Sequence, residues 1–146
     1  MKARLTAFGT YHPEKVMTNQ EMEKLVETND EWIQQRTGIK QRYFVEEDQL
    51  CSHLAIGAVD ALAKTYDKDL SDVDFIIVAS ISPDQTMPSV ASLLQGHYKI
   101  PMCGAIDITA ACAGFVYTLQ LAKGLVESGQ YKKILIVGAE ALSKIT

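Results

Sequence analysis

The stretch FIIVASI at residues 75–81 decides the fold class, because it is a short apolar run rich in β-branched side chains. Two similar runs follow, AIDIT at residues 105–109 and ILIVGA at residues 134–139. Two of the three runs lack polar–apolar alternation, which is typical of strands in a parallel sheet that helices cover on both faces. The midpoints of successive runs are about 29 residues apart, which is the length of a strand with a crossover helix. The pattern predicts β-α-β-α-β units and an α/β fold with a mostly parallel sheet.

The segments around these runs have helical patterns. Apolar residues recur at helical spacing in residues 113–127, and SVASLLQ at residues 89–95 precedes the second run. Gly129 is placed to end the longer of these helices. Upstream, residues 52–66 are rich in small and aliphatic side chains and predict another helix, whereas residues 4–9 predict a first strand.

Residues 10–50 differ from the rest of the chain, because they are polar and rich in charge. TNQE at residues 18–21 and TNDE at residues 28–31 both match the S/T-x-x-E capping box, which predicts two short helices in succession. Segments that leave an open α/β fold often shape ligand sites, so a binding function is expected here. The inner face expected for the first helix consists of Met22, Leu25 and Val26.

The composition excludes several broad functions. The chain has 146 residues, of which 47% are hydrophobic and 22% charged, and this fits one ordinary domain. Its net charge of −4 disfavours a phosphate-backbone partner, so nucleic acid is not expected. The apolar runs are far shorter than the roughly 20 residues of a membrane span, and the first residues do not have the features of a secretory signal. A cytoplasmic protein without a membrane partner is therefore expected.

Three cysteines, Cys51, Cys103 and Cys112, are spaced too unevenly for a disulfide framework or a metal knuckle, so reduced thiols and no bound metal are expected. Cys112 is distinct because it falls between a predicted strand and the helix that begins near Ala113. A helix N-terminus stabilises a thiolate and offers N–H groups to a developing oxyanion, which suits a nucleophile that attacks a thioester. The alternative is that Cys112 is a small buried hydrophobic residue, as Cys51 and Cys103 are expected to be.

Four motifs, taken together and in this order, resemble β-ketoacyl-acyl carrier protein synthase III: DEWI at 30–33, RTGI at 36–39, MPS at 87–89 and AACAGF at 110–115. The resemblance extends over nearly the whole chain and matches the N-terminal half of the family. It implies a thiolase-like fold, with residues 1–146 as the N-terminal thiolase-like domain and the C-terminal half absent from this chain.

The resemblance also implies an activity, that of an acyltransferase that initiates type II fatty-acid synthesis. Cys112 matches the family's nucleophile, which takes the acyl group of an acyl-CoA primer. Malonyl-acyl carrier protein then loses carbon dioxide, and its carbanion attacks the acyl-cysteine to give a 3-oxoacyl product. Acyl-CoA is a substrate in this scheme, so no cofactor is expected.

Thr28, Trp32 and Arg36 follow one another in four-residue steps and are expected on one face of a helix. By resemblance this face binds CoA, which makes residues 10–50 a CoA-binding insertion. The indole would stack on adenine, the guanidinium would contact the base or the phosphates, and the hydroxyl would add a hydrogen bond. The alternative makes Trp32 a core anchor, Arg36 a solvated charge and Thr28 only an N-cap.

Met87 lies in the loop after the run at residues 75–81. The resemblance places at this position a residue that crosses a homodimer interface and contacts the partner's acyl pocket. Relatives often carry an aromatic residue there, so the flexible thioether of Met87 indicates a roomier pocket that accepts longer or branched primers. The alternative is ordinary interface packing.

The family's catalytic histidine and asparagine lie in its second half, and none of this chain's three histidines has a matching context. The chain is therefore expected to be catalytically incomplete alone. The run at residues 134–139 is central in the family's sheet and would leave an apolar edge exposed, so assembly as a homodimer, with a C-terminal half, or both is also expected. A basic docking patch for the acidic acyl carrier protein is also expected. Its candidate residues, for which solvated surface charge is the alternative, are Lys40, Arg42, Lys132 and Lys133.

Two other functions are alternatives to this one. A dinucleotide-dependent oxidoreductase shares the β-α-β pattern but needs G-x-G-x-x-G after its first strand, where this chain has GTYHP at residues 9–13. A truncated subunit that only binds CoA or a partner protein stays open, because it accounts for the missing histidine and asparagine.

Overall fold

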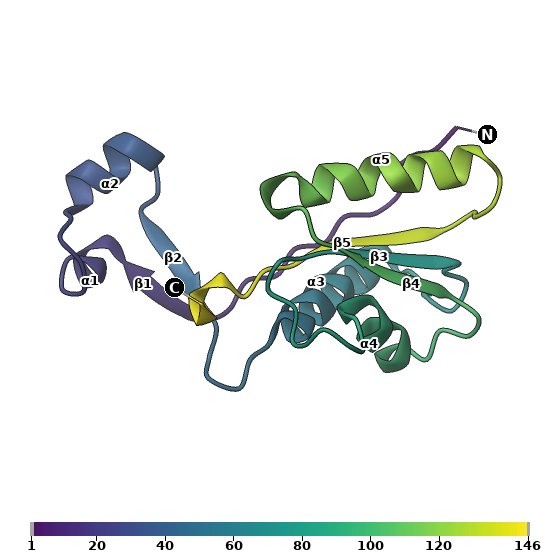
Figure 1. The fold of residues 1–146 in the computed structure, drawn as a ribbon, viewed down its shortest axis with the longest axis horizontal. Helices are drawn as coiled ribbons and strands as arrows, with labels where there is room; N and C mark the ends of the chain where they lie inside the picture. The colour runs from purple at the N-terminus through teal and green to yellow at the C-terminus, as the bar shows by residue number, and fades with distance from the viewer. Residues whose placement is uncertain (1, 146) are drawn as a thin grey trace.

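The computed structural model describes residues 2–145. They form a three-layer α/β body with a small module at one side of it (Figure 1). Among these residues no helix is long and apolar enough to cross a membrane. The helices and strands of the body are α3 (Cys51–Tyr66), β3 (Phe75–Ala79), α4 (Val90–His97), β4 (Gly104–Ile108), α5 (Gly114–Glu127) and β5 (Ile134–Gly138).

Strand β3 lies at the centre of the sheet, with β4 and β5 as its parallel neighbours. Figure 1 shows α5 on one face of the sheet and α3 with α4 on the other. Ile76, Ile77 and Val78 are therefore completely buried. Burial of aliphatic side chains on both faces is the main stabilising contribution in such a sheet. The predicted fold class, a parallel sheet with helices on both faces, is confirmed.

The predicted elements of the body agree closely with the observed ones. The three apolar runs are the strands β3, β4 and β5, which end one or two residues earlier than predicted. The three predicted helices are α3, α4 and α5, and α5 follows directly on a 3₁₀ turn at Ala111–Ala113. Gly129, just beyond α5, has a φ of +80°, which fits its predicted role at the helix end.

Two carboxylates cap helices of the body. Asp107 of β4 accepts hydrogen bonds from the backbone N–H groups of Val90 at 2.8 Å and Ala91 at 2.9 Å, at the start of α4. Asp84, in the loop after β3, accepts one from the N–H of Ser52 in the first turn of α3, at 2.8 Å. Both satisfy donors that the first turn of a helix leaves unpaired, and so fix the helices relative to the sheet.

The strand predicted at residues 4–9 is wrong, because the described part of the N-terminal segment contains no strand before β1. Gly9 instead lies directly against α3, where a Cβ would stand 2.5 Å from the carbonyl oxygen of Ala58. A strand needs a neighbouring strand to pair its backbone, and this segment packs on a helix. Leu5 and Phe8 are accordingly 78% and 65% exposed.

Residues 15–44 form the small module outside the three-layer body (Figure 1). Its strands β1 (Lys15–Thr18) and β2 (Gln41–Phe44) pair antiparallel, and the helices α1 (Asn19–Met22) and α2 (Asp30–Thr37) lie between them in the chain. The two short helices are as predicted. The sequence did not predict β1 and β2, because four residues are too few for a clear alternation.

The capping box is confirmed at Thr18, whose hydroxyl accepts a hydrogen bond from the N–H of Glu21 at 3.3 Å. In return, the Glu21 carboxylate accepts one from the N–H of Thr18 at 2.7 Å. The second predicted box is wrong by one residue: Asn29, not Thr28, caps α2, and accepts from the N–H of Trp32 at 2.8 Å. Asparagine is the stronger N-cap of the two residue types.

The inner face predicted for the first helix is also wrong. Helix α1 ends at Met22, and Leu25 and Val26, in the turn that follows, are 67% and 52% exposed. A single helical turn is too short to present an apolar stripe to a core.

We expect Asp107→Ala to lower the free energy of unfolding by about 1–2 kcal/mol, because two N–H groups at the start of α4 lose their acceptor. Chemical denaturation of the complete protein measures the change. The matched control is Asp48→Ala, at an exposed carboxylate in the loop before α3, which we expect to change stability by less than about 0.5 kcal/mol. Equal losses in the two variants would contradict the capping role.

Candidate functional site

Cys112 lies where β4 passes into α5. The chain leaves β4, enters the 3₁₀ turn Ala111–Ala113 and continues at once as α5 from Gly114. The thiol of Cys112 is exposed, whereas Cys51 is buried and Cys103 is half-buried. The structure thus places Cys112 at the strand-to-helix turn that the sequence predicts, and not in the core.

Two backbone features make this turn tight. Ala111 has a φ of +45°, in the left-handed region that residues other than glycine rarely adopt and that costs about 1–3 kcal/mol. A Cβ on Gly114 would stand 3.2 Å from the Cβ of Ala79, so the missing side chain lets α5 begin directly on the end of β3. Because Cys112 lies between these two residues, its position is set by the backbone.

Helix α5 begins without a side-chain cap. The N–H groups at a helix N-terminus carry a partial positive charge, which stabilises a nearby thiolate or oxyanion. When a thiolate attacks a carbonyl, negative charge moves from the sulfur to the carbonyl oxygen. The turn before α5 is therefore a suitable position for a sulfur nucleophile.

The other two thiols lie in environments that suppress reactivity. The Sγ of Cys51 donates a hydrogen bond to the carbonyl oxygen of Ala139 at 3.3 Å and lies 3.4 Å from the Oγ of Ser80. Burial raises the pKa of the Cys51 thiol to about 11, and burial also raises the pKa of Cys103. Since the thiolate is the reactive form, both thiols stay protonated and unreactive at neutral pH.

The loop after β3 carries Met87, whose side chain is 78% exposed. This loop is fixed at its beginning by Glu140, just beyond β5. The Glu140 carboxylate accepts hydrogen bonds from the N–H of Ile81 at 3.0 Å and the hydroxyl of Ser82 at 2.5 Å. Glu140 was not predicted from the sequence, although a carboxylate directly after a buried strand is a recognisable signal. Met87 thus projects from a loop whose start is anchored.

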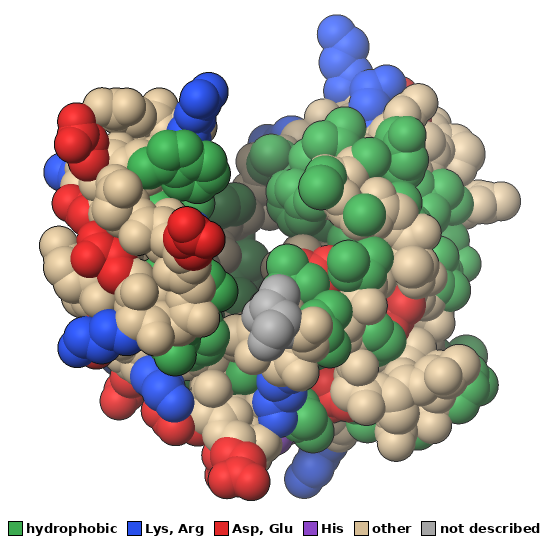
Figure 2. Space-filling view, turned by 60° about the vertical axis from the view of Figure 1, so that its left-hand side comes forward, with side chains coloured by type: hydrophobic (Ala, Val, Ile, Leu, Met, Phe, Trp, Pro, Cys, Tyr) green, Lys and Arg blue, Asp and Glu red, His purple; other side chains and the backbone are tan. Residues whose placement is uncertain are grey.

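The parallel sheet brings these segments to one edge. Since β3, β4 and β5 run in the same direction, the Met87 loop, the Cys112 turn and the Glu140 segment all begin at their carboxyl ends. Figure 1 shows that the small module lies on this side of the body. In the space-filling view of Figure 2, an open notch separates the module from the body.

A hollow on the small module is lined by Glu27, Thr28, Asn29 and Trp32. The indole of Trp32 is 55% exposed. The hydroxyl oxygen of Thr28 is buried and has no hydrogen-bond partner among the described residues. Buried hydroxyls are nearly always paired, so an unpaired one beside an exposed indole is a position where a bound molecule would complete the hydrogen bonding.

The structure brings two of the three predicted CoA-binding residues together. Thr28 precedes α2 and lines the hollow with Trp32, whereas Arg36 lies one turn farther along α2, exposed and outside the hollow. The helical face therefore contains only Trp32 and Arg36. The alternative roles also fail for two residues, because Trp32 is too exposed for a core anchor and Thr28 is not the N-cap.

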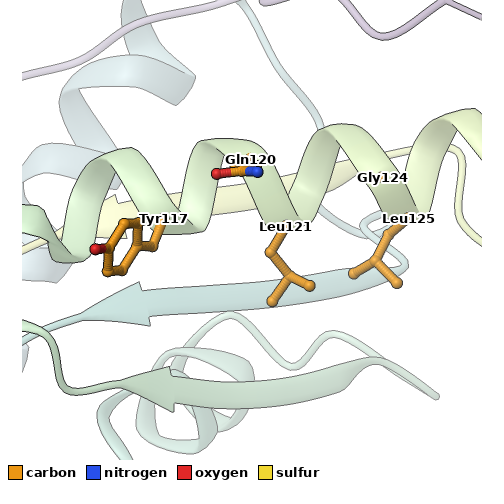
Figure 3. Close-up of a pocket in the computed structure, with 5 residues that line it drawn as sticks. All are labelled: Tyr117, Gln120, Leu121, Gly124 and Leu125. Carbon is orange, nitrogen blue, oxygen red and sulfur yellow. The ribbon is translucent and has the colours of Figure 1, made fainter.

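A second hollow runs along one side of α5 (Figure 3), lined by Tyr117, Gln120, Leu121, Gly124 and Leu125. Tyr117 and Leu121 are 54% and 38% exposed, while Thr118 and Ala122 are buried against the sheet. Helix α5 thus has one buried side and, beside it, a second side with exposed apolar side chains, which is typical of a helix that packs between two layers.

The predicted basic patch is not formed. Lys40 and Arg42 belong to the small module, whereas Lys132 and Lys133 lie just before β5, at the opposite end of the sheet. Lys133 is also paired with Asp72. The four residues therefore do not form one docking surface.

Two of the histidines have structural roles. His12 stacks on Tyr43 with ring centroids 4.0 Å apart, and His53 accepts a hydrogen bond from the N–H of Leu50 at 3.0 Å. Among residues 2–145, no group of three or more His, Cys, Asp or Glu side chains is placed to hold a metal ion.

The groups that the site does offer, an exposed thiol at a helix start and a hollow with an exposed indole, suit acyl transfer through a covalent thioester.

Comparisons with known proteins agree with this reading. Residues 106–146, which include Cys112, match the sequence model of the family described as 3-oxoacyl-[acyl-carrier-protein (ACP)] synthase III. The β-ketoacyl-[acyl-carrier-protein] synthase III 2 of Staphylococcus epidermidis is 56% identical over 144 residues, which cover 99% of this chain and 44% of that protein. The protein of the same name from Halalkalibacterium halodurans is 50% identical over 145 residues, with the same 99% and 44% coverage.

Solved structures give the same result. The synthase III of Thermus thermophilus superposes with a TM-score of 0.92 at 44% identity, over 97% of this chain and 44% of that one. The Aquifex aeolicus synthase III has a TM-score of 0.89 at 39% identity, over 94% and 44% of the two chains. The predicted thiolase-like fold is thus confirmed, and the chain spans less than half the length of these relatives. In sequence and in fold, this chain is similar to part of the β-ketoacyl-[acyl-carrier-protein] synthases III.

Proposed function

We propose that the chain is part of an initiating condensing enzyme, an acyltransferase that joins an acyl-CoA primer to malonyl-acyl carrier protein with loss of carbon dioxide. The observation that carries the proposal is the exposed thiol of Cys112 at the start of α5, within the segment that matches the family. In this scheme acyl-CoA is a substrate, and no cofactor takes part.

In the first proposed step, the Cys112 thiolate attacks the thioester carbonyl of acyl-CoA. The π electrons of the carbonyl move to its oxygen, where the N–H groups at the start of α5 stabilise the negative charge. Collapse of this intermediate breaks the bond to the CoA sulfur, which leaves as a thiolate and takes up a proton. The acyl group stays on Cys112 as a thioester.

In the second proposed step, malonyl-acyl carrier protein loses carbon dioxide, and the carbanion attacks the acyl-cysteine carbonyl. The Cys112 thiolate is released, and the product is a 3-oxoacyl thioester of the carrier protein. The chain covers 44% of its relatives' length. We therefore propose that the groups that stabilise the carbanion come from polypeptide outside this chain.

The small module is the proposed CoA-binding part of the domain, as expected for residues 10–50. The exposed indole of Trp32 offers a stacking surface for adenine, and the unpaired hydroxyl of Thr28 offers a hydrogen bond. Arg36, one turn along α2, provides a positive charge for the phosphates. The notch seen between module and body (Figure 2) is the proposed path of the ligand between the two parts.

The side of α5 that bears Tyr117 and Leu121 is proposed to pack on the rest of the enzyme. Tyr117 and Leu121 expose apolar surface on this face, and β5 is an edge strand among the described strands. A C-terminal half, a second copy of the chain, or both would cover these surfaces. We also propose the cytoplasm as the location, since a nucleophilic thiol has to stay reduced.

A second candidate function is a truncated subunit that binds CoA or a partner protein without turnover. The hollow on the small module favours it, because Thr28 and Trp32 line this hollow and none of the three cysteines does. Formation of the 3-oxoacyl product by the purified complete protein distinguishes the two functions, because a binding subunit yields none.

We expect incubation of the complete protein with acyl-CoA at neutral pH to add one acyl group to Cys112, detected by peptide mass spectrometry. Cys112→Ala should lose the adduct entirely, because no other exposed thiol is present among residues 2–145. The matched control Cys103→Ala should be acylated like the parent. An adduct on Cys51 or Cys103 instead would overturn the assignment of the nucleophile.

We expect Trp32→Ala to raise the dissociation constant for CoA about 5- to 150-fold, since stacking of a base on an aromatic ring is worth roughly 1–3 kcal/mol. Isothermal titration calorimetry measures the constant. Tyr66→Ala is the control, because Tyr66 is also an exposed aromatic residue, 44% exposed, but lies at the end of α3 outside the module. An unchanged constant in Trp32→Ala would rule out the module as the CoA site.

We expect Met87→Phe to lower kcat/KM for a branched acyl-CoA about tenfold or more relative to acetyl-CoA, because a larger, rigid side chain narrows the proposed acyl pocket. The measurement compares the two primers in each variant. Met102→Phe is the control, since Met102 is fully exposed and lies before β4, at the other end of the sheet. If the parent, Met87→Phe and Met102→Phe have the same preference between the two primers, Met87 is a packing residue only.

A further inference from the structure

The small module has almost no apolar core. Within residues 15–44, all of which the structure describes, Ile33 is the only buried hydrophobic side chain, at 4% exposure. Helix α2 has only eight residues and is polar overall, and a helix of that length is not stable alone. Some other interaction must therefore fix α2, which carries Trp32 and Arg36.

The second buried side chain of the module is polar. Asn19, the first residue of α1, has 0% exposure, and both polar atoms of its amide have hydrogen-bond partners. Its Nδ2 donates to the Oδ1 of Asp30 at 2.7 Å and to the carbonyl oxygen of Ile39 at 2.8 Å. Its Oδ1 accepts from the Nη1 of Arg42, on β2, at 3.2 Å.

These bonds hold α2 at both ends. Asp30 is the first residue of the helix, and Ile39 lies directly after its C-cap, Gly38. One amide group that bonds to both positions restrains the direction of the helix axis as well as its location. The bond to Arg42 ties the same side chain to the strand ribbon, so α1, α2 and β2 share one polar centre.

The Asp30 carboxylate strengthens this centre. It also accepts two hydrogen bonds from the Nε2 of Gln34, at 2.9 and 2.8 Å. The bonds from Asn19 and Gln34 hold the pKa of the Asp30 carboxyl below its usual range, so it is ionised at neutral pH. Hydrogen bonds to an ionised acceptor are about twice as strong as neutral ones.

We infer that Asn19 is a positioning residue for ligand binding: it acts through α2 to hold Trp32 and Arg36 in their binding orientation. The inference rests on the proposed CoA-binding function of the module. The other buried side chain of the module, Ile33, packs without directional bonds. It therefore does not set the orientation of α2 as Asn19 does. Apparent affinity falls in proportion to the fraction of molecules whose α2 is correctly placed.

The test uses an exchange of the hydrogen-bonding groups in the complete protein. Asn19→Asp places two carboxylates in contact and removes both donors, so we expect the dissociation constant for CoA to rise about tenfold or more. Asn19→Asp combined with Asp30→Asn restores a donor and an acceptor between the two positions. We expect the double variant to recover most of the lost affinity.

A second measurement separates positioning from general damage. Alkylation of Cys112 by iodoacetamide needs no CoA contact, so its rate should be unchanged in both Asn19 variants. Gln35→Ala, at an exposed position on the same helix, should match the parent in affinity and in alkylation. The inference is overturned if Asn19→Asp binds CoA like the parent, if the double variant is no better than the single one, or if alkylation slows in step with the loss of affinity.

The Trp32→Ala variant distinguishes failure of the inference about Asn19 from failure of the proposed CoA-binding function. If Trp32→Ala weakens CoA binding and Asn19→Asp does not, only the positioning role of Asn19 is refuted. If Trp32→Ala binds CoA like the parent, the CoA site itself is refuted and the inference with it.

Discussion

The arrangement of the site depends on the parallel pairing of β3 with both of its neighbours. Helices bury β3 on both faces, and β4 and β5 run in its direction, so the chain has to leave all three strands at one edge. These exits bring the thiol of Cys112, the loop with Met87 and the carboxylate of Glu140 to the same side of the body. Their proximity follows from sheet topology, because residues that follow parallel strands meet at the carboxyl edge.

The body was predictable because its signals are local. A strand without alternation and a crossover of fixed length can both be recognised within about thirty residues. The error at residues 4–9 has the opposite origin: their composition suits a strand, but pairing needs a partner edge that no local pattern encodes. The cap of α2 is a similar case, since Thr28 and Asn29 are both good N-caps and only the folded chain selects between them.

The site was predictable only in part, for a related reason. Cys112 and Trp32 are uncommon residue types in informative contexts, so the sequence draws attention to them. Asn19 and Glu140 are ordinary polar residues whose importance lies in their partners, 11 residues away for the Asn19–Asp30 bond and 59 for the Glu140–Ile81 bond. Hydrogen bonds between distant positions leave no periodic signal in a sequence.

The two helix-starting thiols show which factor controls reactivity. Cys51 is the first residue of α3 and so also lies at a helix N-terminus, yet burial, with smaller contributions from Asp84 and Glu140, raises its pKa to about 11. The helix start is therefore not sufficient to produce a nucleophile. Cys112 differs in being exposed, next to the left-handed backbone of Ala111. This strain persists because β4 and α5 fix the chain on both sides of the turn. Placement of a helix start at the open edge of the sheet, more than the helix dipole, thus determines which thiol is available for chemistry.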